Sequence, residues 1–190
     1  MRALMCELAV KHGFRKVEAH ETEPFRELSA RAMLSALGIP LWKVPRIVSD
    51  MRALMHEHID EFELYPGVSE MLQQLRAHGA TLAIVSSNSA ENVQHILGPR
   101  NALLITHYSC GASMFGKALK LKSVLRASQL NPEAAIYIGD EIRDGEAARK
   151  MRMAFGAVGW GQHRLDVLRQ QQPAEEFSTV EEITRKLARD

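Results

Sequence analysis

The chain has 190 residues, of which 46% are apolar and 25% charged, an ordinary composition for a globular protein with one domain and a smaller unit. Its net charge of +1 gives no reason to expect nucleic acid or an anionic membrane as a partner. Two cysteines are too few for a disulfide framework and no apolar run could span a membrane, so we expect a cytoplasmic protein.

Residues 1–65 have the periodicity of helices only. The first helix is expected from Arg2 to His12, and the second opens at Thr22 and ends before Gly38. A third is expected over about residues 44–61, where apolar residues recur every three or four positions. The apolar faces of these helices predict a small helical bundle.

Beyond the turn Leu64-Tyr65-Pro66-Gly67, strand and helix patterns alternate. We expect strands over 81–85, 105–109, 135–139 and 157–159, and helices over 68–77, 89–97, 118–129 and 142–152, with a further helix after Phe177. This alternation predicts an α/β fold with a Rossmann-like parallel sheet and helices on both faces. In such sheets ligands bind outside the carboxyl ends of the strands.

Two acidic residues follow one of these strand ends. Asp140 lies where the apolar run stops, and Asp144 falls just inside the next helix, so both carboxylates can face one point. Like charges at close range repel, and hard oxygen ligands suit Mg²⁺, so the pair indicates a magnesium site. The alternative is a solvated acidic turn.

A second strand end carries Ser86, Ser87 and Asn88. Hydroxyl and amide groups at this place can hydrogen-bond a phosphoryl oxygen without adding charge. The alternative for Asn88 is a structural role, since Asn88 and Glu91 have the spacing of a helix capping box. The two roles are compatible, with Ser86 facing the site and Asn88 opening the helix.

Between these two strand ends lies the run Phe115-Gly116-Lys117, ahead of a helical pattern. A lysine that follows a loop glycine can neutralise a phosphate and a carboxylate together. Most lysines are simply solvated, and Lys120 and Lys122 are alternatives for the same role.

Ser86, Lys117 and the run from Gly139 to Asp144 resemble, in their order, three motifs of the haloacid dehalogenase-like (HAD) phosphatases, in particular the phosphoglycolate-phosphatase-like members. The resemblance covers roughly residues 60–185. It implies a helical cap domain over 1–65, a core domain over 66–190, and Mg²⁺-dependent hydrolysis of a small phosphorylated metabolite. It also implies site roles: catalysis by Lys117, substrate binding by Ser86, Ser87 and Asn88, and Mg²⁺ binding by Asp140 and Asp144.

The chain departs from this family in one respect. Family members begin with an apolar strand that ends in Asp-x-Asp, which supplies the nucleophile and the general acid/base, and this sequence contains no Asp-x-Asp. The resemblance therefore implies that the first core strand, central in the sheet between those ending at Ser86 and Asp140, is missing. Either the remaining strands pair with one another, or another chain supplies a strand at this position, or the fold is poorly stable.

Three explanations of this departure remain open. The 190-residue form is an inactive phosphatase, or it is a non-catalytic protein that still binds phosphate or Mg²⁺, or Met1 is an internal start within a longer reading frame. A nucleotide-binding α/β protein is disfavoured, because neither Gly-x-Gly-x-x-Gly nor a Walker-type run occurs.

Overall fold

The structure is a computed structural model that describes residues 2–111 and 116–188. Its contacts divide the chain into two compact units, Met1–Glu61 and Phe62–Asp190. Within the described ranges, no helix combines the length and the apolar character needed to cross a membrane.

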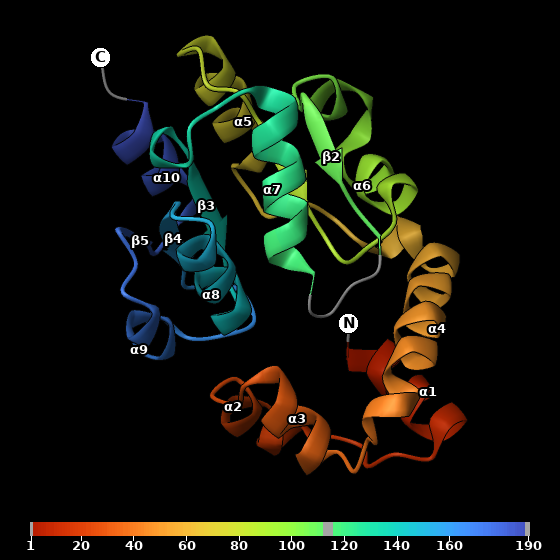
Figure 1. Ribbon diagram of the computed structural model, residues 1–190. Coiled ribbons are helices and arrows are strands. Elements are labelled where there is room, and N and C mark those ends of the chain that lie inside the picture. The colour runs from red at the N-terminus through yellow and green to blue at the C-terminus, as the bar shows by residue number, and fades with distance from the viewer. Residues whose placement is uncertain (1, 112–115, 189–190) are drawn as a thin grey trace. The chain divides into compact units, whose positions relative to one another are not determined.

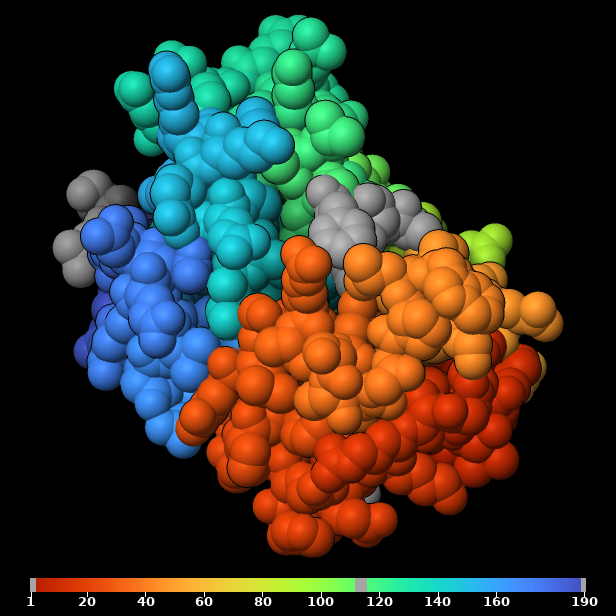
Figure 2. Space-filling model, turned by 60° about the horizontal axis from the view of Figure 1, so that its bottom comes forward, coloured from red at the N-terminus to blue at the C-terminus, as the bar shows by residue number. Residues whose placement is uncertain are grey.

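The first unit is entirely helical. Helix α1 packs against α4, and the buried side chains Leu4, Leu8, Ile47 and Leu54 lie on these two helices. The space-filling view in Figure 2 shows this unit in red to orange. Its helices are α1 (Arg2–His12), α2 (Thr22–Phe25), α3 (Ala30–Ala36) and α4 (Val44–Glu57), with the 3-10 turns η1 (Ala19–Glu21), η2 (Leu41–Lys43) and η3 (Ile59–Glu61).

The prediction of one long helix that opens at Thr22 is wrong. Helix α2 ends at Phe25, and a new helix starts after Ser29, whose hydroxyl accepts a hydrogen bond from the backbone N–H of Ala32 at 3.3 Å. A serine in this position satisfies one of the free N–H groups of a helix start, so it begins a second helix where the apolar pattern alone continues through.

The second unit alternates strands and helices, which confirms the predicted α/β class (Figure 1). All of its paired strands are parallel. Its strands are β1 (Ala83–Val85), β2 (His107–Ser109), β3 (Ile136–Gly139), β4 (Ala154–Val158) and β5 (Glu175–Phe177); its helices are α5 (Val68–Ala77), α6 (Ala90–Ala102), α7 (Lys117–Ser128), α8 (Ile142–Lys150), α9 (Leu165–Leu168) and α10 (Val180–Leu187), with 3-10 turns η4 (Pro132–Ala134) and η5 (Arg169–Gln171).

The strands form two sheets and not one. β1 pairs with β2, and the second sheet has the order β3-β4-β5. In Figure 1, β3 lies on one side of α7 and β2 on the other. Across the described part of the chain β1 and β3 do not pair, so the two sheets have not joined into one.

The strand β5 was not predicted from the sequence. It is only three residues long and two of them are Glu175 and Glu176, so it lacks an apolar run. Its third residue, Phe177, is fully buried and packs with Leu75, Val158 and Ile183 in one core cluster. One deeply buried aromatic residue beside β4 is therefore the main anchor of this strand.

Candidate active site

The segment after β1 forms a hydrogen-bonded polar loop. The hydroxyl of Ser86 accepts from the backbone N–H of Asn88 at 3.1 Å, and Ser87 lies half-buried between them. The side-chain oxygen of Asn88 accepts from the N–H of Ser89 at 2.9 Å and from the amide of Asn92 at 3.0 Å. The loop thereby holds its own shape at the carboxyl end of the strand.

The prediction that Asn88 opens the following helix is wrong by one residue. Ser89 is the N-cap of α6, and its hydroxyl accepts from the backbone N–H of Asn92 at 3.1 Å. Asn88 instead bonds to side chain and backbone within the loop, and its carbonyl accepts from Gly111 at 2.7 Å. Its position beside Ser86 is compatible with the predicted substrate-side role.

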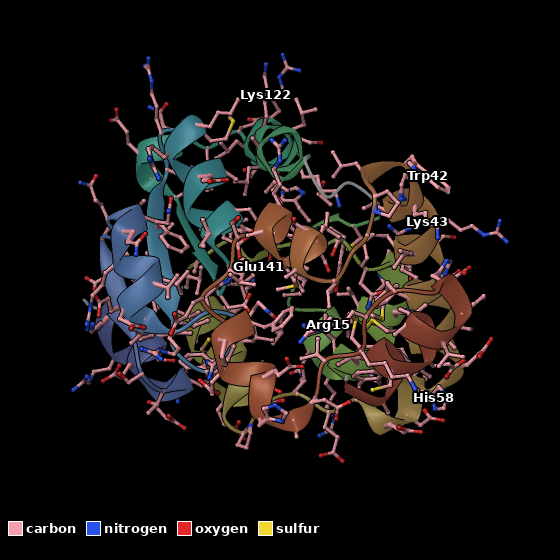
Figure 3. The ribbon with its side chains drawn as sticks, turned by 90° about the horizontal axis from the view of Figure 1, so that it is seen from below. Arg15, Trp42, Lys43, His58, Lys122 and Glu141 are labelled. Carbon is pink, nitrogen blue, oxygen red and sulfur yellow. The ribbon has the colours of Figure 1, made fainter. Side chains whose placement is uncertain are left out.

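Lys117 is the first residue of α7, and the structure places its ammonium between two acidic groups. It forms a hydrogen-bonded ion pair with Asp144, and its distance to the Glu141 carboxylate is 3.6 Å. Of the two alternatives from the sequence, Lys122 is exposed and extends from the same helix (Figure 3), while Lys120 has other partners. Phe115, which precedes this pair in the predicted motif, lies outside the described residues.

Asp144 is nearly inaccessible, with 2% of its side chain exposed, and both of its oxygens are engaged. One accepts from Lys117 and from the Tyr137 hydroxyl at 3.0 Å, and the other accepts from the backbone N–H of Glu141 at 3.0 Å. Burial raises the pKa of the Asp144 carboxyl, and the Lys117 ammonium opposes that rise. Burial and the Asp144 charge also raise the pKa of the Tyr137 phenol.

Sequence reasoning missed Tyr137, Glu141 and Arg143 as members of this group. Glu141 is the N-cap of α8 and forms a capping box with Asp144, and Arg143 is hydrogen-bonded to the Glu141 carboxylate. Burial raises the pKa of Glu141, but the Arg143 hydrogen bond and the nearby positive charges lower it more, so the net shift is downward. The Glu-x-x-Asp spacing of a capping box was the available signal for Glu141.

Asp140 follows the strand β3 and faces a second loop. Its carboxylate accepts from the backbone N–H of Gln162 at 2.6 Å, and its carbonyl accepts from the backbone N–H of His163 at 3.0 Å. A Cβ on Gly161 would overlap the Asp140 side chain, and one on Gly139 would overlap Asp144. Both glycines are therefore needed for the acidic side chains to lie where they do.

Lys120, one helical turn after Lys117, connects the polar loop after β1 to the segment after β2. Its ammonium donates to the carbonyl oxygens of Ser86 and Gly111, which follow β1 and β2. Residues three apart on a helix share one face, so the first turn of α7 contacts the carboxyl ends of both sheets. The structure thus brings Lys117 and Asp144 into contact, with Asp140 at the same turn and Ser86 reached through Lys120.

The turn Tyr65-Pro66-Gly67, which precedes α5, contacts the segment Gly159-Trp160-Gly161, which follows β4. The Tyr65 hydroxyl donates to the Trp160 carbonyl at 3.4 Å, and their rings pack edge to face with centroids 6.5 Å apart. The entry into the second unit is thereby tied to the loop that holds Asp140.

Comparisons with known proteins point to one family. The model of the haloacid dehalogenase-like hydrolase family matches residues 3–158. A phosphoglycolate phosphatase from Synechococcus elongatus is 30% identical over 151 residues, which is 78% of this chain and 71% of that protein.

Solved structures show the same fold. A haloacid dehalogenase-like family hydrolase from Streptococcus pneumoniae has a TM-score of 0.78 at 20% identity, and the match covers 96% of this chain and 88% of that one. CbbY from Rhodobacter sphaeroides, solved in complex with phosphate, has a TM-score of 0.68 at 16% identity, covering 96% and 88% of the two chains. At these identities the likeness concerns the fold alone.

Proposed function

Because this chain belongs to the haloacid dehalogenase-like hydrolase family, we propose that it is a phosphatase-type protein that binds a small phosphomonoester at the carboxyl ends of β1 and β3. The observation that carries the proposal is the first turn of α7. There Lys117 contacts the acidic turn after β3 while Lys120 contacts the polar loop after β1. A phosphoryl group between these ends would meet hydroxyl, amide and ammonium donors.

Each predicted site residue then has a physical role. The hydroxyls of Ser86 and Ser87 and the amide of Asn88 bind phosphoryl oxygens by hydrogen bonds. The Lys117 ammonium compensates the phosphate charge. Asp144 acts as a positioning residue, since its carboxylate is buried and holds Lys117 in place.

The acidic side chains fit Mg²⁺ only if phosphate oxygens of the bound ligand and water complete the metal's coordination. The described part of the chain has no group of three His, Cys, Asp or Glu side chains that could hold a metal ion. Mg²⁺ is commonly bound through one or two carboxylates plus substrate phosphate oxygens and water, a set to which Asp140 can contribute. Asp144 was predicted as a second ligand, but its oxygens are engaged by Lys117, Tyr137 and Glu141. When bound, Mg²⁺ would neutralise phosphate charge.

We further propose that the 190-residue form binds this ligand without turning it over. Its sequence has no Asp-x-Asp, and the carboxylates at the site already serve as structural partners: Asp144 for Lys117, Glu141 for Arg143, and Asp140 for the Gln162 N–H. The same observation favours the second candidate function, a non-catalytic protein that binds phosphate together with Mg²⁺.

Calorimetry with inorganic phosphate and Mg²⁺, combined with a hydrolysis assay on phosphoglycolate, tests both statements. We expect phosphate binding that Lys117→Met weakens by about tenfold or more, as for loss of one charged hydrogen bond, while Lys122→Met leaves it unchanged. Absence of phosphate binding would contradict the proposed binding site at the carboxyl ends of β1 and β3. Hydrolysis that disappears in Asp140→Asn would instead contradict the proposed inactivity and leave the binding site intact.

A further inference from the structure

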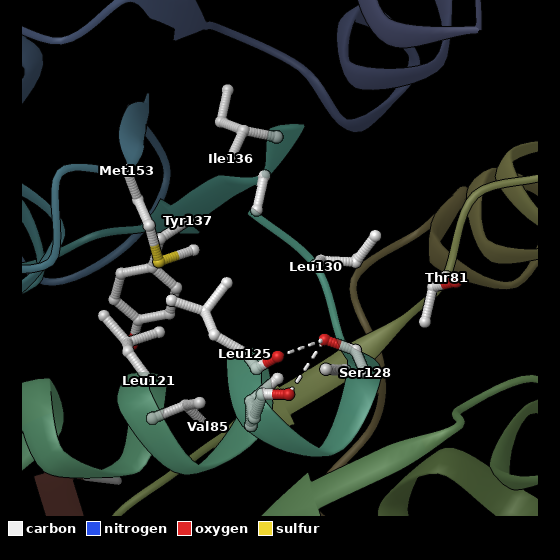
Figure 4. A pocket seen from close by; sticks show the side chains of 12 residues that line it. Thr81, Val85, Leu121, Leu125, Ser128, Leu130, Ile136, Tyr137 and Met153 are labelled. Atoms are coloured by element: carbon white, nitrogen blue, oxygen red, sulfur yellow. Dashed lines mark hydrogen bonds between the residues drawn. The ribbon is translucent and has the colours of Figure 1, made fainter. Parts of the chain in front are cut away.

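Two cavities of this chain differ in the chemistry of their walls. The cavity beside α7 that Figure 4 shows has a volume of about 100 Å³, and aliphatic side chains form most of its lining. Its Ser128 hydroxyl already donates to the carbonyls of Val124 and Leu125, at 2.9 and 3.2 Å. The helical unit, in contrast, holds a cavity of about 520 Å³ that is lined by Lys11, His12, Trp42, Lys43 and Arg46. The lining of this second cavity is basic and aromatic.

The basic cavity lies where the end of α1 meets the beginning of α4. The 3-10 turn η2, which carries Trp42, continues into α4, because Lys43 and the residue after it both have helical φ and ψ. The Lys43 ammonium donates to the carbonyl of His12, the last residue of α1, at 3.2 Å. Trp42, Arg46 and Asp50 follow one another at intervals of four residues, so they lie along one side of this helix.

One carboxylate lies beside the cavity, and α1 already engages it. An Asp50 oxygen is 2.8 Å from the His12 ring nitrogen and 3.1 Å from the Lys11 ammonium. The hydrogen bond from Lys11, with that from His12, holds the pKa of Asp50 below its ordinary value. Arg46, one helical turn before Asp50, has no hydrogen bond or ion pair to the described residues. Its guanidinium is therefore available to a ligand.

The charge of the cavity is positive even when the carboxylate is counted. Lys11, Lys43 and Arg46 carry three positive charges and Asp50 one negative charge, which leaves +2 with His12 neutral. A terminal phosphate carries nearly two negative charges at neutral pH, whereas a carboxylate carries one. The cavity is therefore matched in charge to a terminal phosphate.

Neighbouring carboxylates of the helical unit do not change this balance. In the loop after α1, Glu21 pairs with Arg15. On α1 itself, Glu7 lies toward His58, which follows the other end of α4. The hydrogen bond with Glu61 raises the pKa of His58, and the charge of Glu7 adds to that rise.

Trp42 gives the cavity a flat aromatic wall. The residue is 76% exposed, so most of its indole is open for stacking. The Lys43 ammonium lies 5.5 Å from the centre of the ring, and Figure 3 shows the two residues next to each other. Proteins bind planar anionic ligands through aromatic rings on which the plane stacks, combined with cations that take the phosphate. An exposed indole beside an unengaged guanidinium provides this combination.

We propose that this cavity of the helical unit binds a mononucleotide, a small ligand that joins a planar base to a terminal phosphate. The base stacks on Trp42, and the phosphate oxygens accept hydrogen bonds from the fork of Arg46. Lys11 and Lys43 complete the phosphate contacts, since an ammonium has three donors and each lysine uses some of them within the protein. The volume falls within the range of about 300–1,000 Å³ that is usual for small-ligand sites.

The proposed nucleotide site is separate from the phosphate site of the second unit and does not depend on the proposed function. Helix side chains bind the phosphate here, so the glycine-rich loops of other nucleotide-binding proteins are not required. A nucleic acid strand is a less suitable ligand, because a polyanion needs positive charge along its length and the whole chain has a net charge of only +1.

Calorimetry of the whole chain with adenosine monophosphate tests the assignment. We expect Arg46→Met to weaken binding by about tenfold or more, as for the loss of one charged hydrogen bond. Arg31→Met, which removes an exposed arginine from α3, should change the affinity by less than about twofold. Trp42→Leu should weaken binding by about tenfold through the loss of stacking.

Fluorescence separates base stacking from charge attraction. The chain has two tryptophans, so Trp42→Phe leaves Trp160 as the one indole. Adenosine monophosphate should quench the fluorescence of the parent protein and leave that of Trp42→Phe unchanged. Ribose 5-phosphate, which lacks the base, should bind about tenfold more weakly without quenching, and adenosine, which lacks the phosphate, should also bind about tenfold more weakly.

Four outcomes would overturn the proposal. Quenching that persists in Trp42→Phe, with nuclear magnetic resonance shifts at the amides of Ser86 and Lys117 but not of Arg46, would place the nucleotide in the second unit and leave the proposed function intact. Equal binding of ribose 5-phosphate would show that no base stacks. Equal effects of Arg46→Met and Arg31→Met would reduce the attraction to general charge. Tighter binding of an oligonucleotide or an acidic peptide than of adenosine monophosphate would assign the surface to a macromolecule.

Discussion

The ammonium of Lys117 is hydrogen-bonded to the carboxylate of Asp144, 27 positions further along the chain, with only 13% and 2% of the two side chains exposed. A buried pair of this kind offers little net gain when intact, but the loss of one partner leaves a buried charge without compensation. The acidic turn after β3 therefore depends on α7.

Replacement of this lysine should destabilise the fold strongly. We expect Lys117→Met to lower the free energy of unfolding by about 3 kcal/mol, measured by urea denaturation at neutral pH. The exposed Lys122→Met, on the same helix, should change it by no more than about 0.5 kcal/mol. Equal effects of the two variants would mean that the Lys117–Asp144 contact contributes nothing specific.

The downward pKa shift of Glu141 predicts a pH-dependent contribution to stability. A carboxyl whose pKa is lower in the folded state stabilises the fold above its ordinary value, 4.5, and this contribution is lost as the pH falls through the folded pKa. Glu141→Gln should thus be about 1–2 kcal/mol less stable than the parent at pH 7, with the difference vanishing in acid. Urea unfolding across this pH range tests it, and Glu146→Gln, exposed on the same helix, should show no such trend.

Arg152 should be replaceable by glycine with a gain in stability. It follows α8 with a backbone φ of 56°, a left-handed conformation that disfavours side chains with a Cβ. Arg152→Gly should raise the free energy of unfolding by about 1 kcal/mol, seen as a higher melting temperature. Arg149→Gly, inside the same helix, should lower it by about 1 kcal/mol. A destabilised Arg152→Gly would show that the arginine side chain outweighs the backbone strain.

A methyl group beside Asp140 should weaken binding of metal with phosphate. The Cβ of Gly161→Ala would overlap the Asp140 side chain, whereas that of Gly159→Ala would meet Leu165 at 3.1 Å. We expect Mg²⁺ to bind measurably only when phosphate is present, and Gly161→Ala to weaken that binding about tenfold, or about 1.4 kcal/mol by calorimetry. Mg²⁺ binding without phosphate, or equal effects of both variants, would contradict the proposal that phosphate completes the metal's coordination.

Much of the fold follows from local sequence patterns. Helices α1 and α5 were predicted with the bounds that the structure has, because each is followed by a glycine of positive φ, Gly13 and Gly79. The break before α3 was missed because it depends on the capping hydroxyl of Ser29 and not on the apolar pattern. Strand β5 was missed because its stability comes from Phe177 in the core.

The candidate site was predictable to the level of its motifs but not of its contacts. Lys117, Asp140 and Asp144 were predicted because each falls near the end or beginning of an element and because their order resembles that of a known family. The hydrogen bond from Tyr137 to Asp144 was not, since a tyrosine within a strand pattern gives no sign of which group its hydroxyl meets. Which carboxylates form ion pairs, and which remain available to a metal ion, likewise depends on distances between residues in the folded chain.

The two lysines of the first α7 turn have a consequence for folding and inactivation. Lys117 bonds to the acidic turn after β3, and Lys120 bonds to the polar loop after β1. Because these segments belong to different sheets, fraying of that single turn releases both of them at once. The contacts of these two segments should therefore be lost as one cooperative event on heating, ahead of the strands that carry them.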